Sequence, residues 1–266
     1  MNFLLKNLPE RTEKNRESGL TMVMDKGLSM REAEDLIFSS SSLIDLVKLG
    51  FGSALVTQNL EKKLAVYREA QIPVYLGGTL LEAYIIRGQF KEYLKLLEKL
   101  RLTHAEVSDG SIVLPHPEKC EFIRQLAKYV TVISEVGSKE EGIIIRPNLW
   151  IDMMKSELEA GAWKVIAEAR ESGTVGIYRP SGKAHVVLIN KIISKINPEK
   201  IIWETPQKSQ QAYFIKHFGS NVNLGNIAPN EVIALESLRL GLRSDTFFQF
   251  LDVEMTQKIA SNLNHT

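Results

Sequence analysis

The sequence predicts an α/β protein in which eight strand–helix units close into one barrel, a (β/α)8 fold. Short apolar runs alternate with helix-like stretches along the chain, and no two runs follow each other without such a stretch between them. The length of 266 residues is close to that of a single barrel of this type. A doubly wound open sheet is the alternative, but no G-x-G-x-x-G opens a predicted helix, which disfavours its dinucleotide-binding version.

Each predicted strand is a short aliphatic run that ends in a turn signal, as expected for parallel strands that are buried on both faces. The sixth run shows the pattern clearly, because it is apolar up to Ala167 and then gives way to Glu168, Arg170 and Glu171. The eight runs are residues 20–24, 44–49, 72–76, 104–107, 130–134, 163–167, 200–203 and 221–224.

The stretches between these runs carry helix signals. Ser29 and Glu32 match a capping box, in which each side chain accepts a hydrogen bond from the other residue's backbone amide. Thr79 and Glu82 repeat this spacing, and the helix that they begin is expected to continue to about residue 101. Further helices are expected at residues 59–70, 117–128, 148–160, 186–195, 207–218 and 230–240. The chain is predicted to form a single domain, residues 1–266, with a leader, a barrel core at about 19–247 and a short tail.

The composition excludes several classes of protein. Lys and Arg number 33 against 32 Asp and Glu, so the net charge of +1 gives no general attraction to nucleic acid or to an anionic membrane. The single cysteine, Cys120, cannot form an intramolecular disulfide, which suits a reducing compartment. No apolar segment approaches the roughly 20 residues of a membrane span. We therefore expect a cytoplasmic protein that binds neither nucleic acid nor membrane.

Charged and amide side chains follow nearly every predicted strand. In a closed parallel barrel the carboxyl ends of the strands face one mouth, where active sites are built. The opposite ends carry ordinary residues such as Leu20, Leu43 and Thr103. This sorting by strand end favours a shared site over random surface charge. The exit residues are Asp25, Lys26, Lys48, Gly77, Gly78, Thr79, Glu106, Ser108, Asp109, Glu135, Lys139, Glu168, Arg170, Glu171, Glu204, Asn221, Asn223 and Asn226.

The types of residue at this mouth indicate a hard cation and an anionic substrate. Carboxylates without histidine or thiolate partners are typical Mg²⁺ ligands, and the five histidines show no zinc-ligand spacing. Lysine and arginine beside the acids suit a phosphate or a carboxylate. Gly77, Gly78 and Thr79, at a predicted helix start, offer backbone amides to a phosphate, although a simple tight turn explains them equally well.

The strand exits resemble those of the phosphosulfolactate synthase family, which catalyses the first step of coenzyme M biosynthesis. The similarity runs from about residue 19 to residue 247, in order, through every predicted strand. The matching stretches are G-L-T-M-V-M-D-K-G-L (19–28), I-D-L-V-K-L-G-F-G (44–52), G-G-T-L-L-E (77–82), E-V-S-D-G-S (106–111), S-E-V-G-S-K (134–139), E-A-R-E-S-G (168–173), E-T-P-Q-K-S-Q-Q (204–211), N-V-N-L-G-N-I (221–227) and L-R-L-G-L-R-S-D-T-F (238–247).

The resemblance implies a barrel enzyme that uses Mg²⁺ to add sulfite to phosphoenolpyruvate, giving (2R)-phosphosulfolactate through an aci-carboxylate. It also implies a homo-oligomer, with a trimer as one candidate, and makes Lys139 the expected general acid. Lys48 and Lys26 are alternatives for that role or for binding substrate charge, and Arg170 is expected to bind phosphate or carboxylate, with pairing to Glu168 or Glu204 as its structural alternative. The expected metal ligands, direct or through water, are Glu135, Glu168 and Glu204, with Asp25, Glu106 and Asp109 in reserve.

Two other functions remain open from the sequence. One is a Mg²⁺-dependent enzyme that forms an enolate from another phosphorylated or carboxylated small acid, because a fold does not fix a substrate. The other is a non-catalytic family member associated with stress, which would keep the barrel and lose the mouth. The presence of Glu135, Lys139, Glu168, Arg170 and Glu204 argues against the second.

Overall fold

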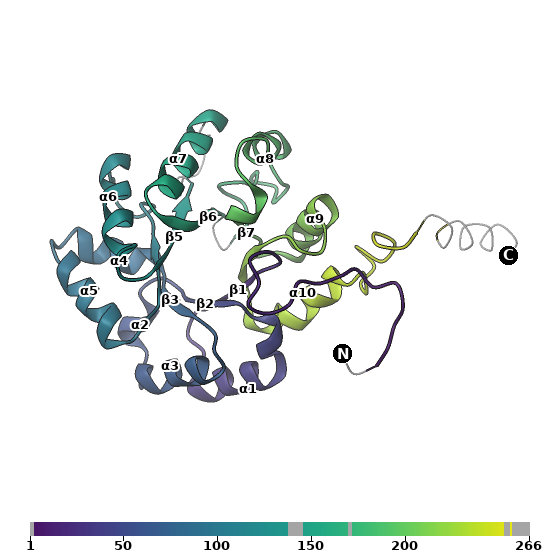
Figure 1. The fold of residues 1–266 in the computed structure, drawn as a ribbon, viewed down its shortest axis with the longest axis horizontal. Coiled ribbons are helices and arrows are strands. Elements are labelled where there is room, and N and C mark those ends of the chain that lie inside the picture. The colour runs from purple at the N-terminus through teal and green to yellow at the C-terminus, as the bar shows by residue number, and fades with distance from the viewer. Residues whose placement is uncertain (1–2, 138–145, 170–171, 253–255, 257–266) are drawn as a thin grey trace, which may run out of the picture.

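Eight parallel strands stand in a ring and the helices surround them, so the predicted (β/α)8 barrel is confirmed (Figure 1). This computed structural model describes residues 3–137, 146–169, 172–252 and 256. The strands are β1 Thr21–Asp25, β2 Leu46–Leu49, β3 Val74–Leu76, β4 His104–Val107, β5 Thr131–Val136, β6 Ala162–Ala167, β7 Ile201–Glu204 and β8 Leu224–Ile227.

The helices fill the connections between these strands. The α-helices are α1 Met30–Ser40, α2 Ser53–Val56, α3 Leu60–Glu69, α4 Gly78–Ile85, α5 Phe90–Lys99, α6 His116–Leu126, α7 Pro147–Glu159, α8 Val186–Ile193, α9 Lys208–Phe218 and α10 Val232–Arg239. Short 3₁₀ turns lie at Ser41–Leu43, Pro198–Lys200 and Pro229–Glu231. The capping box of α1 forms as predicted, with Ser29 accepting from the Glu32 amide and Glu32 accepting from the Ser29 amide.

The strand order around the ring is β3-β2-β1-β8-β7-β6-β5-β4, and all neighbours in this order pair in parallel. The ends of this order, β3 and β4, lie beside each other without a strand ladder between them. A backbone amide spans this seam at the mouth of the barrel, where Gly78 N donates to Glu106 Oε1 at 2.7 Å. The seam therefore depends on a side chain where the rest of the ring depends on backbone pairing.

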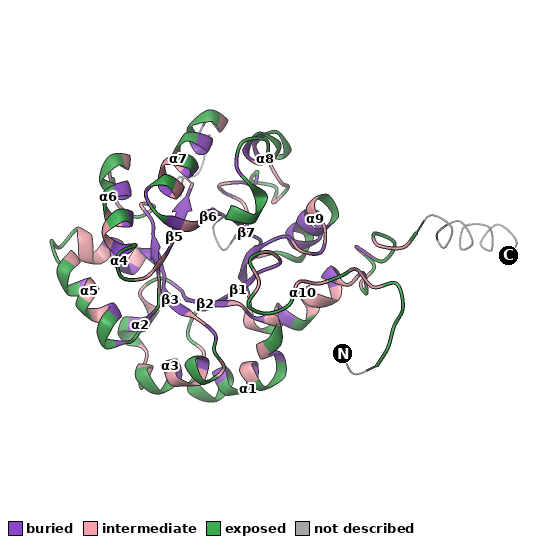
Figure 2. Ribbon diagram, in the orientation of Figure 1, coloured by how far each residue is buried: buried purple, intermediate pink, exposed green. Residues whose placement is uncertain are grey.

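The core has two layers, because each strand buries one face against the helices and the other inside the barrel. In β6, Val165 and Ala167 belong to the layer under the helices, and Ile166 belongs to the barrel interior with Met22 and Tyr75. Figure 2 shows the result, with buried residues on the ring and on the inner sides of the helices, and exposed residues outside. This double burial is why the strands appear in the sequence as unbroken apolar runs.

The predicted position of the last strand, 221–224, is wrong by three residues, since β8 is Leu224–Ile227. Asn223 precedes the strand and closes the lower end of the barrel: its side chain accepts from the Leu20 amide and donates to the carbonyl groups of Glu199 and Ile201. Gly225 interrupts the apolar run, so the strand was not recognised at its correct position. A Cβ there would lie 2.6 Å from Met22 Cε, so the tight barrel interior requires a glycine.

The single helix predicted from residue 79 to residue 101 is also wrong. It is two helices, α4 and α5, because the chain leaves α4 through Gly88, whose φ of +67° is left-handed. The cap residue of α4 is Gly77, not Thr79. Glu82 makes no capping box; its carboxylate accepts from the amides of Gly110 and Ser111 and from the Ser108 hydroxyl, which fixes the loop after β4.

Candidate active site

A cavity of about 740 Å³ lies at the carboxyl ends of the strands. Its charged lining comes from five of the strand ends: Lys48 on β2, Glu106 on β4, Glu135 on β5, Glu168 directly after β6 and Glu204 on β7. Met24, Phe51, Gly78, Thr79, Gly110, Ser111, Ala169, Ser172 and Asn226 complete the described lining. This end of the barrel is where active sites of the fold are found.

The Lys48 ammonium lies among three carboxylates. Its Nζ is 2.8 Å from Glu106 Oε2, 3.3 Å from Glu135 Oε2 and 3.7 Å from Glu204 Oε1. All four side chains are buried, and each comes from a strand, so the ring itself positions them. Three acids on separate strands thus converge on one cation.

Burial and mutual repulsion shift the protonation of this group. Burial disfavours the anion of Glu204 and, although Lys48 opposes the effect, the pKa of Glu204 rises to about 8 with help from Glu135. Burial likewise raises the pKa of Glu106 against the effect of Lys48. Burial alone would lower the pKa of Lys48, but Glu106, Glu135 and Glu204 raise it well above its usual range. The three acids thus favour the charged form of Lys48, and burial favours the protonated form of Glu204.

Residues that follow β5 and β6 position Glu204 and Glu168. The Ala169 amide donates to Glu204 Oε2 at 2.8 Å, and the Tyr178 hydroxyl donates to the Glu204 carbonyl at 2.7 Å. Glu168 packs against Gly137, where a Cβ would lie 2.6 Å from the Glu168 carboxylate. A glycine after β5 is thus needed for Glu168 to reach the mouth.

The predicted phosphate turn, Gly77-Gly78-Thr79, lies at the cavity, and Gly78 and Thr79 line it. Two of its three amides serve protein acceptors: Gly77 N donates to the Leu49 carbonyl at 2.9 Å, and Gly78 N donates to Glu106. A phosphate at this turn would take the Gly78 amide from Glu106.

Asp25 and Asp109 do not line the cavity and have partners elsewhere. Asp25 Oδ2 is 2.6 Å from Lys63 Nζ and accepts from the Tyr67 hydroxyl at 2.9 Å, while Oδ1 accepts from the amides of the β1–α1 turn. Asp109 pairs with Lys119 at 3.0 Å. These contacts show that both aspartates have structural roles outside the cavity. Glu106, the third reserve residue, is the acid closest to Lys48.

Of three further predicted lysine and arginine sites, the structure describes one. Lys26 is exposed and is not among the residues that line the cavity. Lys139 and Arg170 lie outside the described residues. In the described part of the lining, Lys48 is the one cationic side chain beside four carboxylates.

Tyr75 neighbours Lys48 in the barrel interior, and strand exits alone did not reveal it. It pairs in register with Lys48 on the neighbouring strand and is buried in the barrel interior. Burial and then Glu106 raise its pKa well above the usual range, and its hydroxyl finds no hydrogen-bond partner in the described structure. The alternation of the third apolar run, aligned with the second, is the sequence signal that points to it.

No preformed metal cluster appears in the described part of the chain, where no three His, Cys, Asp or Glu side chains are grouped closely enough to hold an ion. The carboxylates gather around Lys48 instead. No helix among the described residues has the length and apolar character needed to cross a membrane.

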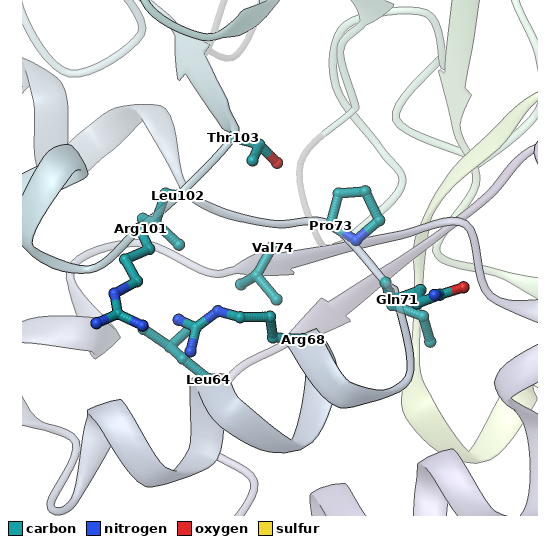
Figure 3. A pocket seen from close by; sticks show the side chains of 9 residues that line it. Leu64, Arg68, Gln71, Pro73, Val74, Arg101, Leu102 and Thr103 are labelled. Carbon is teal, nitrogen blue, oxygen red and sulfur yellow. The ribbon is translucent and has the colours of Figure 1, made fainter.

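A second cavity, of about 280 Å³, lies at the opposite end of the β3–β4 seam (Figure 3). Leu64, Val74 and Leu102 form its apolar part, and the guanidinium groups of Arg68 and Arg101 lie beside each other at its edge. Arg68 donates to the Leu100 carbonyl at 3.1 Å, just after α5, where the partial negative charge of a helix end favours a cation. Arg68 thus binds a helix end, and this cavity has no carboxylate in its described lining, so the larger cavity is the candidate active site.

Comparisons with known proteins identify relatives of this chain. A family model described as (2R)-phospho-3-sulfolactate synthase (ComA) matches residues 9–245. The chain is 40% identical over 251 residues to the phosphosulfolactate synthase of Bacillus subtilis (strain 168), covering 93% of this chain and 100% of that protein. It is also 40% identical over 239 residues to the phosphosulfolactate synthase of Methanocaldococcus jannaschii, covering 87% and 94%.

Among solved structures, the 3-hexulose-6-phosphate synthase from Salmonella typhimurium aligns with a TM-score of 0.55 over 84% of this chain and 100% of that chain. At 12% identity, that likeness shows the fold alone. The family match extends over nearly the whole barrel, and with it the relatives at 40% identity show that this chain belongs to the (2R)-phospho-3-sulfolactate synthase family of enzymes.

Proposed function

We propose that this protein is a lyase-class enzyme that forms a carbon–sulfur bond by adding sulfite to phosphoenolpyruvate, giving (2R)-phosphosulfolactate with Mg²⁺ as cofactor. Membership of the family supports the proposal. The observation that carries it in this chain is the convergence of Glu106, Glu135 and Glu204 on the Lys48 ammonium at the floor of a cavity large enough for a small acid.

The reaction forms one bond to sulfur and one to hydrogen. The sulfur lone pair of sulfite attacks the methylene carbon of phosphoenolpyruvate, and the π electrons of the double bond move toward the carboxylate. The resulting aci-carboxylate takes a proton at the carbon that bears the phosphate ester. The phosphate stays in place, so the enzyme must stabilise extra negative charge on the carboxylate and deliver one proton on the correct face.

The charge of the described cavity supports a role for a bound cation. Even with Glu204 protonated, the remaining carboxylates of the lining outnumber the Lys48 ammonium, so two anionic substrates would be repelled unless positive charge is supplied. Carboxylate oxygens on separate strands and the unpartnered Tyr75 hydroxyl fit a hard cation that keeps part of its water shell. Glu135, Glu168 and Glu204, together with Glu106, would hold Mg²⁺, one or two of them directly. When bound, the ion would neutralise these acids and stabilise charge on the substrate carboxylate.

The lysines then divide the remaining work. Lys48 is held by three acids that raise its pKa, so it acts as a fixed positive charge that orients the glutamates rather than as a proton donor. Lys139 follows β5 by three residues in the sequence and is proposed as the general acid. Arg170 follows β6 and is proposed to bind phosphate or carboxylate.

Purified protein incubated with phosphoenolpyruvate, sulfite and Mg²⁺ tests the proposal, with the product followed by mass spectrometry. Phosphosulfolactate should accumulate with sulfite and Mg²⁺ present, and should be absent when either is omitted or when Glu135 is changed to Gln. If calorimetry shows that phosphoenolpyruvate binds but no product forms, the same site acts on a different reaction of a small phosphorylated or carboxylated acid.

A further inference from the structure

A second group of buried charges lies behind the active site, between the barrel and the helices α6 and α7. Lys119 on α6 and Glu157 on α7 have no exposed surface, and Asp109 in the loop after β4 is mostly buried. The two helices stand side by side next to β5 (Figure 1). None of these three side chains lines the cavity.

Lys119 connects two walls of the cavity from behind. Its Nζ donates to the carbonyl oxygen of Glu135 at 2.6 Å and to Asp109 Oδ1 at 3.0 Å, and it pairs with Glu157 Oε1 at 2.9 Å. Glu135 is one of the acids around Lys48. Asp109 directly precedes Gly110 and Ser111, which line the other side. One ammonium therefore joins the end of β5 to the loop that follows β4.

Stability alone does not account for this arrangement. Burying an ammonium and two carboxylates costs desolvation energy, and a well-packed apolar set of similar volume is often as stable or more stable. Burial alone would lower the pKa of Lys119, but Glu157 and Asp109 raise it to about 12, so the group stays charged. His116, 3.2 Å from Glu157, adds a further polar contact. Apolar side chains could not donate a hydrogen bond to the Glu135 carbonyl in β5, as Lys119 does.

We propose that Lys119 is a positioning residue that sets the backbone at Glu135 and the 109–111 loop, and thereby the spacing of the two cavity walls. The effect expected on turnover rests on the proposed function; the effect on the backbone does not. Glu157 acts as the counter-charge that lets Lys119 remain ionised in the interior.

The test separates positioning from simple charge balance by means of a double variant. Lys119→Met alone strands the buried Glu157 carboxylate and should lower the melting temperature. Lys119→Met with Glu157→Gln removes that unpaired charge and should restore most of the stability. The contacts to the Glu135 carbonyl and Asp109 stay lost, so amide hydrogen exchange at residues 108–113 and 134–137 should be about tenfold faster than in the wild type.

Turnover gives the second readout. In the double variant, kcat should fall by about 10- to 100-fold with a smaller change in KM, because misplaced groups affect the transition state more than the bound substrate. Lys164→Met is the matched control. This lysine is equally buried and donates to the carbonyl groups of Glu17 and Glu199, but at the opposite end of β6, so its loss should change stability and leave kcat within about twofold of the wild type.

Each outcome decides the matter. Restored stability with wild-type exchange in both segments would overturn the proposal and leave Lys119 as a partner of Glu157. If the wild-type protein makes no phosphosulfolactate but the double variant still shows faster exchange in both segments, the positioning role stands and the proposed reaction is rejected. If the double variant does not fold, Asp109→Asn provides the test, because it removes one contact of a partly exposed side chain. Compared with the wild type, this variant should show faster exchange at 108–113 and unchanged exchange at 134–137. The same change in exchange rate in both segments, or no change in either, would overturn the proposal.

Discussion

At the scale of single residues, burial raises the pKa of acids at the mouth of the barrel, and Glu204 is the clearest case. Glu204 is buried and faces Glu135 and Glu106, and among the described residues Lys48 lies 3.7 Å from its carboxyl group. Its proton is therefore held in the folded protein at pH values where an unfolded glutamate has lost it. The stability that this proton contributes is fully present below the unfolded pKa, near 4.3, and is lost as the pH rises through about 8.

We expect Glu204→Gln to flatten the pH dependence of stability. In wild-type protein with EDTA, the free energy of unfolding should decline between pH 5 and pH 8.5, and in the variant the decline should be smaller by about 1 to 3 kcal/mol. Urea unfolding at several pH values measures this. Exposed Glu199→Gln, at the other end of the barrel, is the control and should retain the wild-type slope. Parallel slopes in wild type and Glu204→Gln would show that Glu204 ionises normally.

Lys139 is expected to carry the proton that completes the reaction. Because Lys48 is locked among three acids, Lys139→Ala should reduce turnover by about 10² to 10⁴-fold, the usual contribution of a general acid. Binding of phosphoenolpyruvate, measured by calorimetry, should remain detectable. Turnover like that of the wild type would remove Lys139 from the mechanism and return the role to another donor.

At the scale of elements, the seam between β3 and β4 differs from the other joins of the ring, which are strand ladders. No strand ladder crosses it, and the Gly78 amide bridges it to Glu106. A Cβ on Gly78 would lie 2.1 Å from Ser108 Oγ and 3.0 Å from Glu106 Oε1. The start of α4 therefore approaches β4 as closely as it does only because residue 78 has no side chain.

Gly78→Ala should force α4 and β4 apart. We expect a loss of about 1 to 3 kcal/mol in the free energy of unfolding, the usual cost of overpacking, together with lower activity since Glu106 is displaced. Gly52→Ala is the matched control, because Gly52 lies just after β2 and a Cβ there would meet Leu80 only at 4.0 Å. Equal stability of the two variants in urea would mean that the seam has room to adjust.

Elements also show how far the sequence could be interpreted. Seven strands were predictable because burial on both faces produces apolar runs. All five charged lining residues follow from the rule that strand ends meet at one mouth: Lys48, Glu106, Glu135, Glu168 and Glu204. β8 was misplaced because it contains a glycine, Gly225, at a tightly packed position of the barrel interior and an asparagine, Asn226, with a left-handed φ of +58°. The partners of Asp25 and Asp109 were not predictable, since Lys63 and Lys119 reach them from helices whose facing depends on tertiary packing.

At the scale of the whole molecule, the active site and the barrel are one structure. The four acids and Lys48 are brought together by strands that span the chain from β2 to β7, so excess negative charge in the mouth pushes against the closure of the ring. A divalent cation that binds only when those strands are assembled would favour the folded state by mass action. The barrel should therefore be more stable with its cation than without it.

Mg²⁺ should raise the melting temperature, and at 100 times its Kd the stabilisation should be about 2.7 kcal/mol. The measurement is a thermal scan in MgCl₂ against NaCl of equal ionic strength, after treatment with EDTA. Glu135→Gln should abolish most of the shift, because one of the converging acids is gone. Asp45→Asn should keep the shift, since Asp45 pairs with Arg16 and binds the Thr21 amide at the other end of β1. If Mg²⁺ raises the melting temperature of the Glu135 variant as much as that of the wild type, the ion binds elsewhere on the molecule. An ion bound among the strand-end acids would lose affinity, and so stabilise less, when the Glu135 carboxylate is removed.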